Sequence, residues 1–191
     1  MLPVISRKNA KVKMFDQSNA LCEVLTFKEG LLSAFGHDLR IVATSFFIKM
    51  QNSPPGIKAV FDSGSLLVDC AMEKDTPRPG LLTDKDRLDI NRNTRKDVLE
   101  ANRYEAIIFV SSGVRKKETA YEIEGELSLH GHTAGISLAA SRDEGYYVSE
   151  TWLHLPDFGI KPFSTAWGTI RIKPDVLVRV KIPISELEGF L

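Results

Sequence analysis

Cysteine is scarce in this sequence, and its scarcity excludes one class of small protein. The chain contains two cysteines, Cys22 and Cys70, which are too few for the disulfide framework of a small secreted domain. Each lies in a strand-like segment, where a buried and unreactive thiol is typical. An apolar core must therefore hold the chain together.

Long apolar runs are also absent. No stretch approaches the roughly 18 residues that a membrane-spanning helix needs, so we expect no membrane span. Residues 1–8 lack the charged start, the apolar stretch and the small-residue cleavage site of a secretory signal. We therefore predict a cytoplasmic protein.

The sequence has no excess of either charge. Its 25 basic and 25 acidic residues cancel, so no overall field attracts the chain to nucleic-acid phosphates, and we expect no nucleic-acid partner. The fractions of hydrophobic residues, 43%, and of charged residues, 26%, are ordinary for a globular protein. The length suits a single domain over residues 1–191, with its core at about residues 20–185.

Several enzyme motifs are missing as well. The sequence has no nucleophile-elbow Gly-x-Ser-x-Gly, no phosphate-binding Gly-x-x-x-x-Gly-Lys and no dinucleotide fingerprint. Asp84, Asp86 and Asp89 lack the later glycine and glutamate that complete a calcium loop. We therefore expect neither a cofactor nor an enzymatic activity.

What the sequence does contain is a series of short segments with alternating apolar residues. Between Val176 and Ile184 apolar side chains occupy every second position, which is typical of a strand with one dry and one wet face. The other predicted strands are 21–28, 39–50, 57–70 with a bend at 62–65, 107–111, 122–129, 136–140, 147–155 and 169–173.

One helix is predicted, over Thr94 to Arg103, where Thr94 and Asp97 resemble a capping box. The charged stretch Glu73 to Arg87 contains prolines and lacks strand periodicity, so we expect a surface loop there. One helix cannot cover a parallel sheet. The pattern therefore favours an antiparallel barrel or sandwich.

Two histidines invite a metal hypothesis. In a strand, His130 and His132 would share a face, and His37 or Asp38 could supply a third ligand for a metal-assisted enzyme. However, the alternate residues from Ile123 to Leu129 form the dry face of that segment, which leaves both histidines on the wet face. We expect hydrogen-bonded histidines near a turn and no metal, with the enzyme kept as an alternative.

Three passages resemble the YceI-like, or polyisoprenoid-binding, domain family. They are Ser33 to Leu39, Glu124 to Thr133 and Leu155 to Ile160, and their order and separation match the family from about residue 20 to 185. The resemblance implies an all-β fold, an eight-stranded antiparallel lipocalin-like barrel with one short helix near its mouth. It also implies non-catalytic binding or carriage of a long lipid or isoprenoid-like molecule in an apolar tunnel.

The resemblance and the strand pattern together name the expected ligand-binding residues. Each faces the expected interior, lies at its mouth or belongs to a family motif. They are Phe35, His37, Leu39, Phe46, Phe61, Phe109, Leu127, Leu129, His130, Phe158, Val178 and Val180. The partner would be a long-chain apolar small molecule. A fully packed barrel that acts as an interaction module is a further alternative, and a homodimer is left open.

Overall fold

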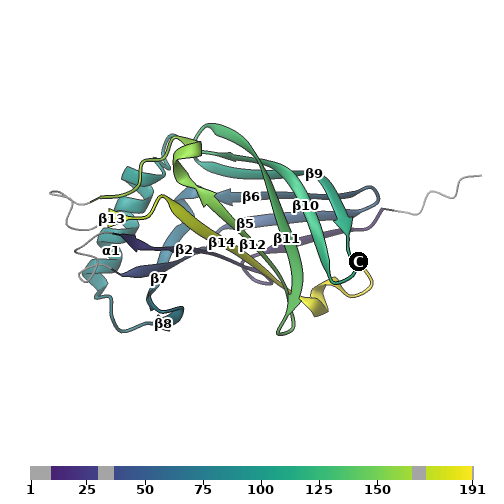
Figure 1. The fold of residues 1–191 in the computed structure, drawn as a ribbon, viewed down its shortest axis with the longest axis horizontal. Coiled ribbons are helices and arrows are strands. Elements are labelled where there is room, and N and C mark those ends of the chain that lie inside the picture. The colour runs from purple at the N-terminus through teal and green to yellow at the C-terminus, as the bar shows by residue number, and fades with distance from the viewer. Residues whose placement is uncertain (1–9, 30–36, 165–170, 191) are drawn as a thin grey trace, which may run out of the picture.

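The structure, a computed structural model, describes residues 10–29, 37–164 and 171–190. Figure 1 shows a sheet that curls around the long axis of the molecule, with helix α1 at one end. The helix spans Asp84–Asn93 and continues into a π-helical turn at Thr94–Val98. The strands are β1 (Val12–Asp16), β2 (Leu21–Thr26), β3 (Lys28–Glu29), β4 (Asp38–Ala43), β5 (Phe46–Asn52), β6 (Pro55–Asp62), β7 (Leu66–Glu73), β8 (Thr76–Arg78), β9 (Ala106–Lys116), β10 (Ala120–Leu129), β11 (His132–Asp143), β12 (Tyr146–His154), β13 (Arg171–Ile172) and β14 (Asp175–Pro183).

A long bent hairpin gives the sheet its curled form. The main sheet is antiparallel, in the order β1-β5-β6-β9-β10-β11-β12-β14-β2-β4-β7-β8, and β13 pairs separately with β3. The chain passes from β4 to β5 at Thr44 and from β6 to β7 at Ser63–Ser65. One long arm of the hairpin consists of β4 and β5, and the other of β6 and β7. Since β4 pairs with β7 while β5 pairs with β6, one half of the hairpin lies near each end of the strand order. The sheet is thereby drawn round into a barrel-like form.

The all-β, antiparallel fold predicted from the sequence is confirmed, but the count of eight strands is wrong. The structure has more than eight strands, because the bends at Thr44 and at Ser63–Ser65 divide two long strands. The short strands β1, β3, β8 and β13 add to the count. β3, β8 and β13 are two or three residues long and have no buried residue, and Phe15 is the one buried residue of β1, so these segments offer little of the apolar alternation that predicts a strand.

The predicted helix boundaries are also wrong, since α1 begins at Asp84 and not at Thr94. The Thr83 hydroxyl accepts a hydrogen bond from the Asp86 backbone N–H, and the Asp86 carboxylate accepts one from the Thr83 N–H at 2.9 Å. This capping box, with the Thr83 hydroxyl as the main cause, lowers the pKa of Asp86. The helix escaped prediction because none of its residues is buried, so it has no apolar stripe.

The start of α1 also changes the interpretation of the charged stretch Glu73 to Arg87. The structure places β8 and the first turn of α1 inside this predicted loop. β8 pairs with β7 through its backbone, with all three of its residues exposed. A small cluster of Val68, Ala71 and Leu82, with Ile90 packed against it, holds α1 on β7.

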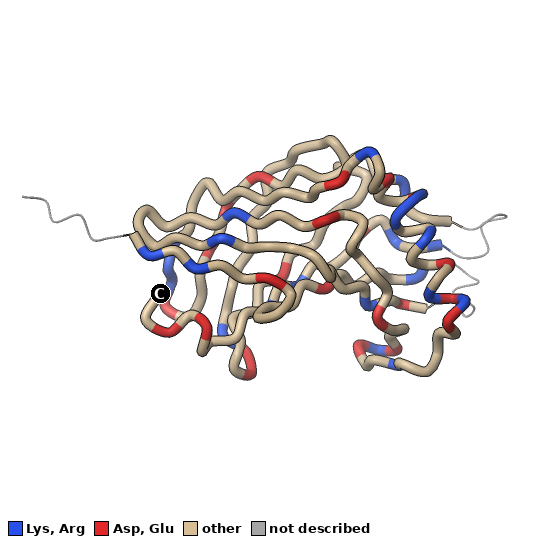
Figure 2. The backbone as a smooth tube through the Cα atoms, turned by 180° about the vertical axis from the view of Figure 1, so that it is seen from behind, with Lys and Arg blue, Asp and Glu red and all other residues tan. Residues whose placement is uncertain are grey.

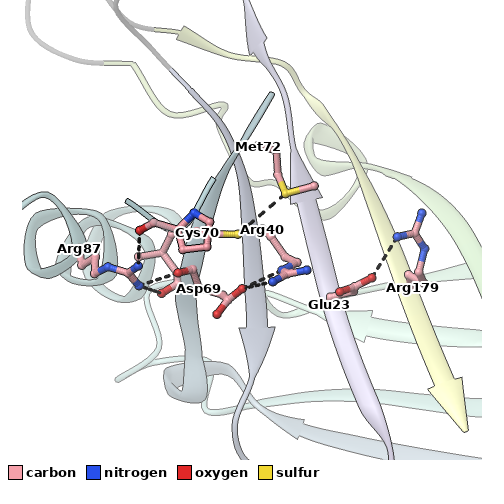
Figure 3. Close-up of polar contacts among 9 residues, drawn as sticks. Glu23, Arg40, Asp69, Cys70, Met72, Arg87 and Arg179 are labelled. Carbon is pink, nitrogen blue, oxygen red and sulfur yellow. Dashed lines mark hydrogen bonds and ion pairs between the residues drawn. The ribbon is translucent and has the colours of Figure 1, made fainter. Parts of the chain in front are cut away.

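A row of charged residues crosses the outer face of the sheet (Figure 3). Arg179 of β14 donates to Glu23 of β2 at 3.0 Å and also to Glu150 of β12. Farther along the row, Arg40 of β4 pairs with Asp69 of β7. The Glu23 side chain is only 4% exposed, so its charge depends on Arg179 for compensation. These contacts therefore join β12, β14 and β2 to one another, and β4 to β7.

Elsewhere on the surface the two signs of charge are mixed. Figure 2 shows Lys and Arg interspersed with Asp and Glu along the strands and over α1. Within the described ranges, no helix is both long enough and apolar enough to cross a membrane.

Candidate functional site

The inward-facing side chains of the long strands do not fill the barrel. An apolar cavity of about 260 Å³ remains among residues of β2, β4, β5, β6, β7, β9, β10, β11, β12 and β14. On β14 every second residue from Val176 to Ile182 lines it, so the dry face predicted for this strand faces the cavity. Ile184, the last residue of the predicted alternation, lies instead in a 3₁₀ turn at Ile184–Leu187.

The cavity lining is almost entirely apolar. Among the described lining residues there is no Asp, Glu, Lys, Arg or His. The lining residues with polar side-chain oxygens are Ser149, Thr151, Tyr121 and Tyr147. A buried water requires two to four polar partners, so most of this volume suits an apolar guest better than it suits water.

Small residues leave the space open. Ala43, Ala59 and Ala140 line the cavity from three different strands. At Gly125 of β10, a Cβ atom would come within 2.6 Å of the Phe109 ring, so this ring occupies the place of a side chain. The cavity therefore depends on residues of precise size at adjacent positions of the sheet.

The Cys22 thiol faces the cavity but offers no reactive group. Burial first, and the neighbouring Glu23 charge second, raise the pKa of Cys22 to about 12. The thiol therefore stays protonated at neutral pH, and a protonated thiol is a poor nucleophile.

A histidine and a glutamate meet near one end of the cavity. His130, in the turn between β10 and β11, is 8% exposed, and its Nε2 lies 3.2 Å from Glu100 Oε1. The imidazole ring lies 4.3 Å from the Tyr104 ring, measured between centroids. Within the described part of the chain, its Nδ1 is buried without a hydrogen-bond partner. The neighbouring residues Leu99 and Leu129 line the cavity.

The prediction that His130 lies on the wet face is wrong. β10 ends at Leu129, and His130 and Gly131 have φ angles of 53° and 77°, so the strand alternation stops before the histidine. A Cβ atom on Gly131 would lie 2.7 Å from the Tyr104 ring. Glycine therefore allows this turn to pack against Tyr104, and the packing buries His130.

His132 has a different environment, which removes the geometry that the metal hypothesis needed. It is exposed, and its Nε2 lies 2.7 Å from the position of a Cβ on Gly159. The turn thus separates His130, which contacts Glu100, from His132, which lies beside the passage Leu155 to Ile160. Over the described ranges, no three His, Cys, Asp or Glu side chains are grouped closely enough to hold a metal ion.

The structure places half of the predicted ligand-binding residues at the cavity. Those that line it are Phe61, Phe109, Leu127, Leu129, Val178 and Val180. The others are the core residues Phe46 and Phe158, the half-buried His37 and Leu39, and the turn residue His130. Phe35 lies outside the described residues.

Sequence reasoning missed many smaller lining residues, such as Val24, Ile57, Ile136 and Leu138. It gave preference to aromatic side chains, whereas most of the cavity wall is aliphatic. The strand alternation contained the missing signal, since these residues occupy inward positions of predicted or extended strands.

Comparison with known families identifies the fold. A model of the YceI-like domain family matches residues 58–184, which include most of the cavity wall. The chain belongs to the YceI-like domain family. A search of curated proteins gave no match.

Two solved structures have a fold similar to this YceI-like chain. One is BcnA of Burkholderia cenocepacia, with a TM-score of 0.58 and 13% identity, covering 85% of this chain and 94% of that one. The other is a polyisoprenoid-binding domain from Saccharophagus degradans implicated in plant cell wall breakdown. It has a TM-score of 0.56 and 11% identity, covering 90% of this chain and 98% of that one. At sequence identities this low, the two comparisons show a shared fold and nothing about a shared ligand.

Proposed function

We propose that the protein binds a long apolar molecule, a lipid or an isoprenoid-like chain, in the barrel cavity without changing it chemically. The observation that carries the proposal is the cavity itself, about 260 Å³ of space whose described lining contains no charged residue. The raised pKa of Cys22 adds support, because it leaves the thiol at the cavity wall unreactive.

The size of the cavity sets the length of chain that it can enclose. An engineered apolar cavity of about 150 Å³ holds benzene, so by the same scale this one takes on the order of ten carbon atoms. Burial contributes roughly 0.8 kcal/mol per methylene, or about 8 kcal/mol for ten. After the cost of immobilising the guest, a dissociation constant between roughly micromolar and millimolar remains.

The family supports the chemical class of the guest. The structurally similar Saccharophagus degradans protein is described as a polyisoprenoid-binding domain. An isoprenoid tail is a branched hydrocarbon, and a wall of Val, Leu, Ile and Phe side chains offers it dispersion contacts but asks for no specific hydrogen bond.

Filling the cavity tests the proposal. Ala140 lines the cavity, whereas Ala139, its neighbour on β11, is exposed. We expect Ala140→Phe to abolish the fluorescence gain of parinaric acid, a straight-chain conjugated probe, and Ala139→Phe to leave it unchanged. Thermal unfolding of both variants would show that each is folded.

Solvent extraction of the purified protein, followed by mass spectrometry, should also release an apolar molecule from the unsubstituted protein in larger amount than from Ala140→Phe. Equal probe binding by the two phenylalanine variants would contradict binding in the cavity. Failure of the unsubstituted protein to bind the probe or to release any apolar molecule would overturn the function itself.

A further inference from the structure

A second hollow lies next to the cavity. It is a surface groove of about 530 Å³ between the ends of β5 and β6, the start of β9 and the segment that follows α1. Exposed Phe47 gives it apolar surface, while Asn102, Glu105 and Arg95 give it polar and charged surface. The cavity wall is almost entirely apolar and has no charged residue among its described lining, so the two neighbouring hollows differ in chemistry.

Only a thin wall separates the groove from the cavity. Phe61 lines both of them, and its ring lies 5.5 Å from that of Phe46. Leu99 lines the cavity, and Ala101, two residues later, lines the groove. We call Phe61 and the segment Leu99–Ala101 the plug. A displacement of these residues would join the two hollows.

The plug contains a strained residue. Glu100 has a φ of 44°, a left-handed conformation that costs free energy for any residue with a Cβ atom. Backbone and side-chain contacts hold it there: its carbonyl accepts hydrogen bonds from the Arg103 N–H at 2.7 Å and the Tyr104 N–H at 3.0 Å, and its carboxylate contacts His130 and, at the surface, Arg103.

The His130 side of this contact also has an energetic cost. Its Nδ1 is buried without a partner in the described part of the chain, and an unsatisfied buried polar atom costs free energy that contact with water would recover. Two features therefore raise the free energy of the closed plug: the left-handed backbone of Glu100 and the unpaired Nδ1 of His130. Both would be relieved if the segment moved away from the turn between β10 and β11.

We propose that the groove is the entrance of the binding site. An amphiphilic chain passes its apolar tail across the plug into the cavity and keeps its polar end in the groove, near Asn102 and Glu105. The contact between Glu100 and His130 holds the plug closed. This inference rests on the proposed function and adds to it a route and a second compartment for the polar end.

Site-specific blocking of the groove tests the route. The native thiols do not interfere, because Cys22 and Cys70 are buried and burial raises the pKa of each. A polyethylene-glycol maleimide can therefore be attached to Asn102→Cys in the groove. The matched control is Glu118→Cys, which lies in the turn between β9 and β10, at the opposite end of β9 from the groove.

We expect the label on Asn102→Cys to slow parinaric acid uptake by about tenfold or more in stopped-flow fluorescence, which corresponds to at least roughly 1.4 kcal/mol in the barrier. The label on Glu118→Cys should leave the rate unchanged. Equal rates for the two labelled proteins, or slowing only at Glu118→Cys, would overturn the entrance. If even the unlabelled protein takes up no probe, the proposed function falls, and the entrance with it.

The plug contact has its own test. Glu100→Ala keeps the left-handed backbone under strain but removes the carboxylate that contacts His130. Uptake should become about three- to tenfold faster, as expected for the loss of one hydrogen bond. Arg103→Ala is the control, since it removes the 3.6 Å surface ion pair of Glu100 with Arg103 and the guanidinium over the Tyr104 ring but keeps the contact of Glu100 with His130. An unchanged rate in Glu100→Ala, or an equal gain in both variants, would overturn the role of the contact.

Discussion

At the scale of single residues, Gly125 shows how the cavity depends on a missing side chain. A Cβ atom there would meet the Val110 carbonyl oxygen at 2.5 Å and the Phe109 ring at 2.6 Å. The backbone oxygen cannot move without disturbing the pairing of β9 with β10, and the ring can move only at the expense of its packing.

We predict that Gly125→Ala lowers the free energy of unfolding by about 1–3 kcal/mol, the usual cost of overpacking a core. It should also weaken binding of an apolar probe, because Phe109 lines the cavity and the new methyl group displaces its ring. Urea unfolding measures the first effect, and fluorescence titration measures the second.

Gly135→Ala is the matched control for this change. Gly135 lies on the neighbouring strand β11, and a Cβ there meets nothing within 4 Å, so we expect a change of less than about 0.5 kcal/mol. A similar loss of stability in both variants would show that β propensity, and not the contact with Phe109, explains the effect.

The direction in which a side chain faces was predictable from the sequence where a strand continues. It was not predictable where the chain turns. Val178 and Val180 line the cavity because the alternation of β14 is unbroken around them. His130 follows an equally regular strand but is buried against Tyr104, because two left-handed residues reset the direction of its side chain. Alternation contains no information about contacts made by a turn.

At the scale of elements, the row of charges on the outer face fixes how β2, β14 and β12 lie together. Glu23 is opposite Arg179 in the register of β2 and β14, and Arg179 is opposite Glu150 in that of β14 and β12. Burial alone would make the Arg179 charge costly. The hydrogen bonds with Glu150 and Glu23 outweigh burial and raise the pKa of Arg179.

We predict that Arg179→Met lowers the free energy of unfolding by about 2–3 kcal/mol, because it leaves the Glu23 carboxylate buried and unpaired. The double variant Glu23→Leu with Arg179→Met should recover most of this loss, since it leaves no buried charge. Urea unfolding of the two variants provides the measurement.

Glu150→Ala serves as a comparison. It removes only the more exposed partner of Arg179, so its cost should stay below about 1 kcal/mol. The explanation fails if the double variant is no more stable than Arg179→Met, because the loss would then come from packing and not from the isolated charge.

The elements themselves were predictable to different degrees. The long strands β10, β12 and β14 have clear alternation and were found. The helix α1 was placed too late, because none of its residues is buried and its cap at Thr83 precedes a charged sequence. The short strand β8 is held by backbone pairing with β7 and by an exposed ion pair of Arg78 with Glu73, neither of which leaves an apolar pattern in the sequence.

At the scale of the whole molecule, the cavity sets a limit on the part of a guest that the barrel encloses. For a series of straight-chain alcohols, we predict that binding strengthens by roughly 0.8 kcal/mol for each added methylene until the chain reaches on the order of ten carbons. Beyond that length the added carbons stay outside the cavity, and the gain should flatten. Isothermal titration calorimetry would show this break.

An affinity that keeps increasing steadily with chain length would contradict the limit, because it would require the interior to enlarge around the guest. The volume itself was not predictable from the sequence. An alternating pattern shows which residues face inward. It does not show whether side chains as small as those of Ala59 and Ala140 leave the interior of the barrel unfilled.

The pairing of β2 with β14 also determines when the cavity closes during synthesis and folding. Cys22 lies opposite Val180, so part of the cavity wall joins residues from opposite ends of the described chain. During synthesis, the earlier strands leave the ribosome long before residues 175–183 do, and pairing across such a separation forms slowly. The cavity wall is open until that final strand docks. A guest is therefore enclosed only after β14 has been translated and has paired with β2.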